Sequence, residues 1–211
     1  MTDEQDDIGD EDWQEIQQQL KDAGLDVQLV DGGEGDEGEA DDYADDTILA
    51  IFDHSERGNI EDLEKILSEA SQQIELNTPG PDGDTALHLA CLYGHLPCAD
   101  LLIKKGASAN TINQEDGSSA LHDAAAGGYL DICRLLLEHS SEDMIHKADM
   151  DGDTPLHNAA RGNHAEVVEF LLSKGADPSI LNSEGKTPAG EAEEREVVAL
   201  LVKAAATVKK E

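Results

Sequence analysis

The sequence predicts an all-α protein built of repeated helix pairs and preceded by an acidic segment that does not fold on its own. A short motif recurs in the second half of the chain at intervals of 34 and 35 residues. Two apolar stretches with helical spacing follow each copy of the motif. The first 46 residues instead combine strong negative charge with few apolar residues, a composition typical of disorder.

The acidic segment, residues 1–46, holds 19 of the 48 acidic residues and one basic residue, Lys21. Its Gly-rich and acidic stretch at 31–39 predicts a disordered tail, because like charges on a flexible chain repel one another. Trp13, Ile16 and Leu20 are spaced for one helix face and predict a short amphipathic helix near 11–23. A helix this short is marginal in water, so we expect it to dock either on its own repeats or on a partner.

The recurring motif marks the start of each helix pair. Its clear copies are at 85–90, 119–124 and 154–159, a weaker copy begins at Thr187, and a turn dipeptide such as Asp-Gly precedes each one. The two apolar stretches of a unit are separated at Gly94, Gly128 or Asn163. Helices often end in the left-handed region, which Gly enters freely and Asn next best. Each unit is therefore predicted to contain a turn, a helix, a tight break, a second helix and a return loop.

This pattern resembles the ankyrin repeat, and three units match the family's T-P-L-H and G-H motifs. The resemblance implies an ankyrin-repeat solenoid of stacked helix pairs, with turn fingers along one edge and stability supplied by neighbouring units. We expect the repeats to cover 47–206, in five units at about 47–78, 79–113, 114–148, 149–181 and 182–206. The outer units are degenerate caps. In the last unit Gly190 replaces the motif His and Val197 arrives early, which predicts that the break between its helices is missing.

Residues that suggest chemistry have structural explanations. His88, His122 and His157 recur once per unit and so do not converge on one metal; the family implies that they hydrogen-bond each turn to its neighbour. The two Asp-Gly-Asp turns lack the calcium-loop pattern, and no nucleophile, phosphate-loop or zinc-protease motif is found. We therefore expect a protein that is not an enzyme and that binds no metal and no cofactor.

A net charge of −34 limits the class of partner. Nucleic acids and anionic membranes need basic residues to bind, so neither is expected, whereas basic proteins would be attracted. Cys91, Cys98 and Cys133 form no disulfide framework and suit a reducing compartment. No apolar run approaches a membrane span and no signal peptide is evident. We expect a monomer in the cytoplasm or nucleus.

The resemblance places a partner along the fingers and the adjacent face of the first helices. Tyr93 is the expected anchor because aromatic side chains dominate binding hot spots, while carboxylates set orientation and encounter rate. Solvation of a turn explains any single carboxylate equally well. The candidate residues are Asp82, Asp84, Asp116, Asp151 and Asp153 on the fingers, Leu92, Tyr93 and Arg161 on the helices, and Trp13, Ile16 and Leu20 in the tail.

The predicted function is a non-catalytic, chaperone-like module that sequesters or escorts a basic client protein. The resemblance suggests a client of the ribosomal-protein or histone type, because the chain is similar in charge and size to ankyrin proteins that protect such clients. One alternative is a regulatory scaffold that masks a transcription factor or an enzyme. A factor that delivers clients to a membrane is disfavoured by the acidic fingers. The sequence leaves open whether the acidity serves solubility alone, and whether the tail recruits the partner or blocks the binding face.

Overall fold

A computed structural model describes residues 39–69 and 74–208, and the backbone of this part is helical apart from turns and one isolated bridge between Ile112 and Ser119. The helix predicted near 11–23, with Trp13, Ile16 and Leu20, lies outside the described residues. Because the described backbone is a series of helices joined by short turns, the all-α prediction is confirmed.

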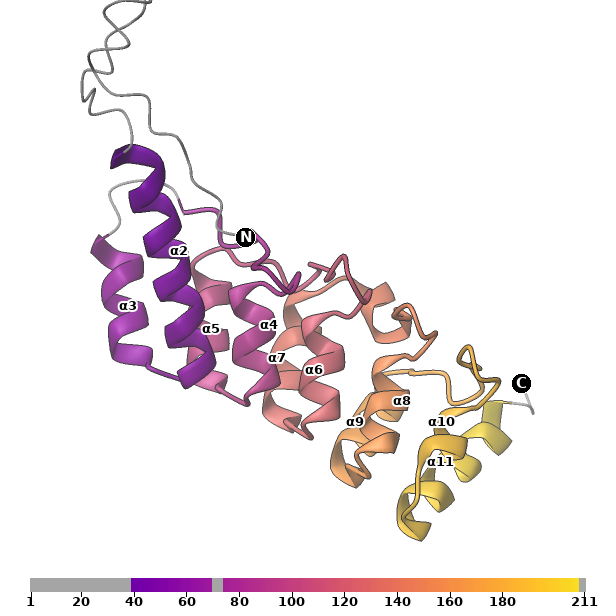
Figure 1. Ribbon diagram of the computed structural model, residues 1–211. Coiled ribbons are helices and arrows are strands. Elements are labelled where there is room, and N and C mark those ends of the chain that lie inside the picture. The colour runs from indigo at the N-terminus through magenta and orange to yellow at the C-terminus, as the bar shows by residue number, and fades with distance from the viewer. Residues whose placement is uncertain (1–38, 70–73, 209–211) are drawn as a thin grey trace, which may run out of the picture. The chain divides into compact units, whose positions relative to one another are not determined.

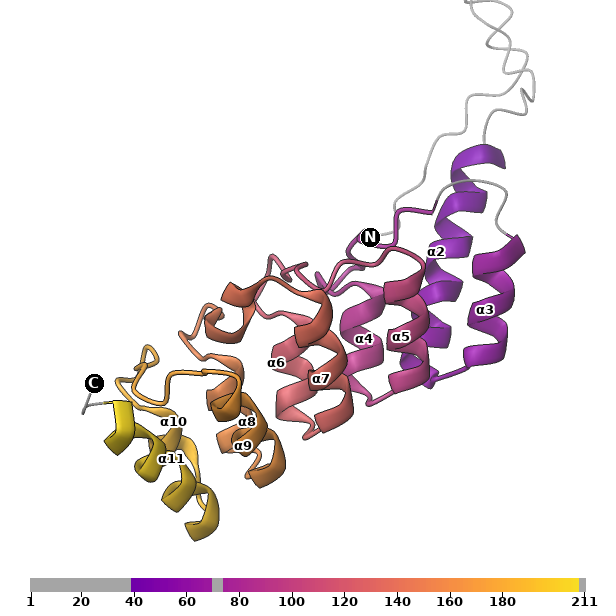
Figure 2. The same ribbon diagram turned by 180° about the vertical axis from the view of Figure 1, so that it is seen from behind.

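The helices come in pairs that follow one another in chain order (Figures 1 and 2). Among the second to fifth pairs, the first helices pack on one another in sequence, and so do the second helices, which gives two layers. This is the stack that the repeat pattern predicts. The pairs are α2 (Glu39–Arg57) with α3 (Ile60–Glu69), α4 (Ala86–Leu92) with α5 (Leu96–Lys104), α6 (Ala120–Ala126) with α7 (Leu130–His139), α8 (Pro155–Arg161) with α9 (Ala165–Ser173), and α10 (Pro188–Glu191) with α11 (Arg195–Val208); a 3-10 helix, η1 (Glu142–His146), follows α7.

The first helix of the stack begins earlier than the boundary expected at residue 47. Helix α2 starts at Glu39, and the compact unit that contains the repeats spans Asp41–Glu211. The segment before residue 47 contains Ala40 and Ala44, and alanine has the highest helix propensity of all residues. The acidic segment therefore ends inside the first turns of a helix.

The breaks between paired helices follow the prediction. Gly94 and Gly128 have φ values of 78° and 75°, and Asn163, with φ 56°, enters the same left-handed region. The glycines also leave room for the next unit, because a Cβ atom on Gly94 would lie 2.5 Å from the ring of Tyr129, and one on Gly128 would lie 2.4 Å from the ring of His164. Each break is thus a contact between units as well as a turn.

The predicted loss of the break in the last unit is wrong. The break is present between α10 and α11, and it is the first helix that is shortened. Helix α10 ends at Glu191, because the backbone of Ala192 is extended. The N–H groups of Glu193 and Glu194 donate to Oδ1 of Asn163 at 3.0 and 2.8 Å. Gly190 is a poor helix former, and the preceding unit supplies the capping acceptor.

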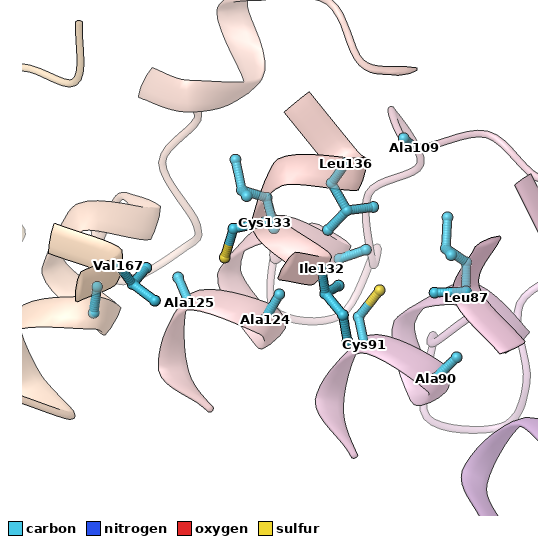
Figure 3. Packing of buried hydrophobic residues seen from close by; sticks show 14 of the residues in the cluster. Leu87, Ala90, Cys91, Ala109, Ala124, Ala125, Ile132, Cys133, Leu136 and Val167 are labelled. Atoms are coloured by element: carbon cyan, nitrogen blue, oxygen red, sulfur yellow. The ribbon is translucent and has the colours of Figure 1, made fainter. Parts of the chain in front are cut away.

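The core lies between the two layers and is built from small and aliphatic side chains. Ala90, Ala124 and Ala159 are fully buried and allow the first helices to approach closely. Leu136 of the second layer is also buried, and it lies near Ala124 and Ile132 (Figure 3). The three cysteines are buried free thiols, and burial raises the pKa of Cys133 to about 12. They therefore pack as small hydrophobic residues, as predicted.

Candidate protein-binding face

The fingers are joined to the helices by the motif histidines. In each of the three full units the imidazole Nδ1 accepts the backbone N–H of the helix-capping residue, at 3.2 Å for His88 and 3.1 Å for His122 and His157. The proton is therefore on Nε2, which donates to the carbonyl oxygen of Asp153 from His122, at 3.1 Å, and to that of Lys186 from His157, at 3.2 Å. The expected link from one finger to the next is confirmed at these two positions. In the part of the chain that is described, His88 Nε2 is buried without a hydrogen-bond partner.

Burial lowers the pKa of all three imidazoles, because the protein interior disfavours the charged form. The carbonyl groups of Asp153 and Lys186 partly offset this effect at His122 and His157, and the charges of Asp84 and Asp116 do so at His88. In the unfolded chain the pKa of histidine returns to about 6.5. Below that pH the unfolded chain binds protons that the folded chain does not, so the folded state loses stability as pH falls.

We predict that the free energy of unfolding decreases between pH 7 and pH 5.5, by at most about 1.4 kcal/mol per pH unit for each buried imidazole. Urea titrations at a series of pH values measure this, at high salt to screen the net charge. Asp123 changes the free energy of unfolding in the opposite direction, because burial raises the pKa of its carboxyl. The titrations are therefore best made on the Asp123→Asn variant. A stability that is constant or rises over this range in that variant contradicts the prediction.

The candidate carboxylates do not share one environment. Asp82, Asp116 and Asp151 are exposed in the finger turns, and Asp84 is half-buried, with its Oδ1 accepting Asn113 Nδ2 at 2.9 Å. Asp153 differs from the exposed row that the sequence suggested, because its side chain is only 5% exposed. The face is therefore acidic at the tips of three consecutive fingers, whereas the Asp153 carboxylate is not accessible to a partner.

Asp153 and Arg161 are paired with each other. The guanidinium of Arg161 contacts Asp153 through Nη2 and donates from Nε to Glu191 Oε2 at 3.3 Å. Asn182 Nδ2 donates to Asp153 Oδ1 at 2.8 Å and to Glu191 Oε1 at 3.1 Å. Sequence reasoning missed this network, although Arg161 is the only basic residue that ends a first helix in the three full units.

Two opposing effects set the pKa values in this network. Burial raises the pKa of both the Asp153 and the Glu191 carboxyl, but hydrogen bonds from Arg161 and Asn182, together with the charge of Arg161, outweigh it, and the net pKa of each is lowered. Both carboxylates therefore stay ionised at neutral pH. The network joins the fourth and fifth units by charge-assisted hydrogen bonds.

Leu92 and Tyr93 supply the apolar part of the face. They lie at the end of α4, with 40% and 47% of their surface exposed, and the Tyr93 ring stacks on His95 with 6.5 Å between centroids. The next two units have Gly127 and Gly162 in the place of Tyr93. A Cβ atom on Gly127 would lie 2.2 Å from the Tyr129 ring, and one on Gly162 would lie 2.5 Å from the His164 ring, so neither position has room for a larger side chain. Among the full units, only the first presents an aromatic side chain at this position.

The described ranges also bear on three other kinds of feature, namely a metal site, a membrane span and a surface hollow. No group of three or more His, Cys, Asp or Glu side chains in them is arranged to hold a metal ion. In the same ranges, no helix combines the length and the apolar character that a membrane crossing requires. A hollow of about 400 Å³ lies between α7, η1 and α9, where the Arg134 guanidinium covers the Phe170 ring at 4.7 Å. Ser140, Ser141 and His146 line it, but Ser141 hydrogen-bonds to Asn110 and the buried Ser140 hydroxyl has no partner among the described residues, so neither serine is paired with the histidine.

The fold defines a helical-repeat protein in which turn fingers lie beside the first helix of each full unit. The family model described as "Ankyrin repeats (3 copies)" matches residues 50–148, and the model described as "Ankyrin repeat" matches residues 151–183. The chain belongs to the ankyrin-repeat family.

Several curated proteins are similar to the chain. The Notch-regulated ankyrin repeat-containing protein of Homo sapiens is 40% identical over 89 residues, which are 41% of this chain and 77% of that protein. Notch-regulated ankyrin repeat-containing protein B of Danio rerio is 40% identical over 82 residues, 38% of this chain and 73% of that protein. Protein phosphatase 1 regulatory subunit 27 of Mus musculus is 36% identical over 89 residues, 42% of this chain and 56% of that protein. The family and these relatives support a protein-binding, regulatory module.

Proposed function

We propose that this protein is a non-catalytic module that sequesters or escorts a basic client protein on its acidic finger face. The observation that carries the proposal is the row of exposed carboxylates Asp82, Asp116 and Asp151 on consecutive fingers, beside the exposed Leu92 and Tyr93. Charge and apolar surface therefore lie on neighbouring parts of the same units. A segment that is basic and carries one apolar anchor fits this combination.

The two parts of the face have different physical roles. A net charge of −34 raises the rate at which basic proteins encounter the chain. The finger carboxylates add orientation more than affinity, because exposed charges are well solvated. Burial of Leu92 and Tyr93 under the client supplies affinity that salt does not screen. The buried free thiols Cys91, Cys98 and Cys133 fit a reducing compartment, so we place the protein, as a monomer, in the cytoplasm or nucleus.

The test is capture of partners from lysate by the full chain at low and at moderate salt. A variant with Asp82→Asn, Asp116→Asn and Asp151→Asn removes three finger charges. Its matched control, Glu138→Gln with Glu166→Gln and Glu169→Gln, removes three charges from exposed positions on α7 and α9. We expect a basic client that the control retains and the finger variant loses. Equal retention by both variants, or a client that is not basic, contradicts the proposal.

A regulatory scaffold is the second candidate, since one relative is named a phosphatase regulatory subunit and Tyr93 and Leu92 are exposed side by side. Such a partner would be held at moderate salt and lost in Tyr93→Ala. A chain shortened to residues 39–211, which keeps α2 intact, tests the tail in the same assay. Weaker capture by this chain indicates a recruiting tail, and stronger capture indicates a tail that blocks the face.

A further inference from the structure

Two junctions of the stack carry the same pair of acidic positions, and only one of them contains a cation. The closed junction, between α8 and α10, consists of Asp153, Asn182 and Glu191 around Arg161. Asp153 precedes the residue that caps α8, and Glu191 follows the motif position of the next unit. The guanidinium of Arg161, the last residue of α8, joins the two carboxylates.

The open junction, between α4 and α6, places Asp84 and Asp123 at the corresponding positions. Asp84 precedes the residue that caps α4, and Asn113 Nδ2 donates to its Oδ1 at 2.9 Å, as Asn182 does to Asp153 at 2.8 Å. Asp123 follows the motif residue His122 of the next unit. The last residue of α4, where Arg161 stands in the closed junction, is Leu92. The acidic framework is repeated, and its arginine is missing.

The carboxylates of the open junction have no cation of their own. Among the described residues no ion pair includes Asp84, Asp116 or Asp123, and Asp123 Oδ2 is closed off from solvent with no hydrogen-bond partner. Burial, and then the nearby charges of Asp84 and Asp116, raise the pKa of Asp123 well above its usual range. A buried, unpaired carboxylate is unfavourable for the fold.

The repeat itself does not require a carboxylate at the position of Asp123. The neighbouring unit has Asn158 in the place of Asp123, and the preceding unit has Leu89. An uncharged residue is therefore compatible with the same backbone. An unpaired, largely buried carboxyl group next to two further carboxylates is a feature typical of binding sites.

We infer that Asp84 and Asp123, with Asp116 beside them, form a socket for one arginine side chain of the client, which takes the place that Arg161 fills in the closed junction. This inference rests on the proposed function, because it assigns the charge complementarity to one side chain. Arginine suits the socket better than lysine, since its planar fork can bridge two carboxylates, as Arg161 does. Leu92 and Tyr93, exposed at the end of α4, would cover its aliphatic part.

The first test uses Nα-acetyl-L-arginine methylamide as the probe, with the lysine and citrulline analogues as controls, on the isotope-labelled full chain. We expect the arginine probe alone to shift the amide resonances of residues 84, 116 and 123 in a saturable manner. Asp123→Asn should weaken its binding about tenfold or more, while Asp151→Asn, which removes the same charge from an exposed finger, should change it by less than about twofold.

The second test fills the socket from within. Leu92→Arg places an arginine where the closed junction has one, so it should raise the midpoint of thermal unfolding and abolish binding of the arginine probe. The matched control is Ala126→Arg, since the junction beside Ala126 has Ser118 and Asn158 in place of the two carboxylates. The control should not raise the midpoint.

The outcomes separate the socket from the proposed function. Equal shifts from the arginine and lysine probes, equal effects of Asp123→Asn and Asp151→Asn, or no gain of stability in Leu92→Arg relative to Ala126→Arg would each overturn the socket. Salt-sensitive capture of a basic client by the fingers would then still support the proposed function. Arginine-selective binding of the probe, with no basic client captured from lysate, would support the socket and overturn the proposed function.

Discussion

Replacement of Leu136 by Ala is expected to lower the free energy of unfolding by about 2–5 kcal/mol. Leu136 belongs to α7, the second helix of the third unit, and is 1% exposed. Helix α7 packs on α5 and α9, the equivalent helices of the neighbouring units, so a cavity here weakens contacts in both directions along the stack. Urea unfolding followed by circular dichroism measures the change.

Leu92→Ala is the matched control, because it makes the same chemical change at a side chain that is 40% exposed. Surface substitutions usually change stability by no more than about 0.5 kcal/mol. A loss in Leu136→Ala as small as in this control would mean that the cavity collapses and that the central units are not closely packed. A change in the slope of the urea transition would instead indicate that the stack no longer unfolds as one unit.

Arg161→Leu is expected to lower the free energy of unfolding by about 1–3 kcal/mol, because it leaves Asp153 without its cation and Glu191 with Lys186 alone, whose Nζ lies 3.4 Å from Glu191 Oε1. The side chains of Asp153 and Glu191 are 5% and 9% exposed, whereas Arg161 is 49% exposed; solvent screening keeps the effect below that of a fully buried pair. Thermal and urea unfolding of the variant at neutral pH measure the loss.

The stability lost in Arg161→Leu should become smaller as pH falls. The folded pKa values of Asp153 and Glu191 are lowered, so the stabilisation is present above the unfolded values near pH 4 and disappears as pH falls through the folded ones. Wild type and Arg161→Leu should therefore converge below about pH 4. Arg57→Leu, which breaks an exposed pair with Asp53, should cost roughly 0.3–0.5 kcal/mol. An equal loss in both variants would show that the closed junction adds nothing.

The features that depend on backbone geometry could be predicted from the sequence. Gly94, Gly128 and Asn163 mark the breaks, because few other residues enter the left-handed region at a helix end. The motif histidines and the caps beside them recur at a fixed interval, which identifies the start of each pair. These signals are local, so one chain suffices to find them.

The features that depend on contacts between units could not be predicted in the same way. Asp153 and Arg161 look like independent surface residues in the sequence, and their pairing across to Glu191 requires knowing which side chains meet at a junction. The break before α11 was missed because its cap is Asn163 of the preceding unit. The early start of α2 at Glu39 was missed because the acidic composition of the segment before residue 47 is typical of disorder.

The last residue of the first helix differs between successive full units, where it is Leu92, Ala126 and Arg161. The backbone around this residue is nearly constant. Its side chain therefore decides whether the junction presents an apolar group, as with Leu92, a methyl group, as with Ala126, or a cation that pairs with the carboxylates, as with Arg161. Selection could therefore open, close or move a recognition site along such a protein one codon at a time. New specificities would then be accessible by ordinary point mutation and by duplication of a unit.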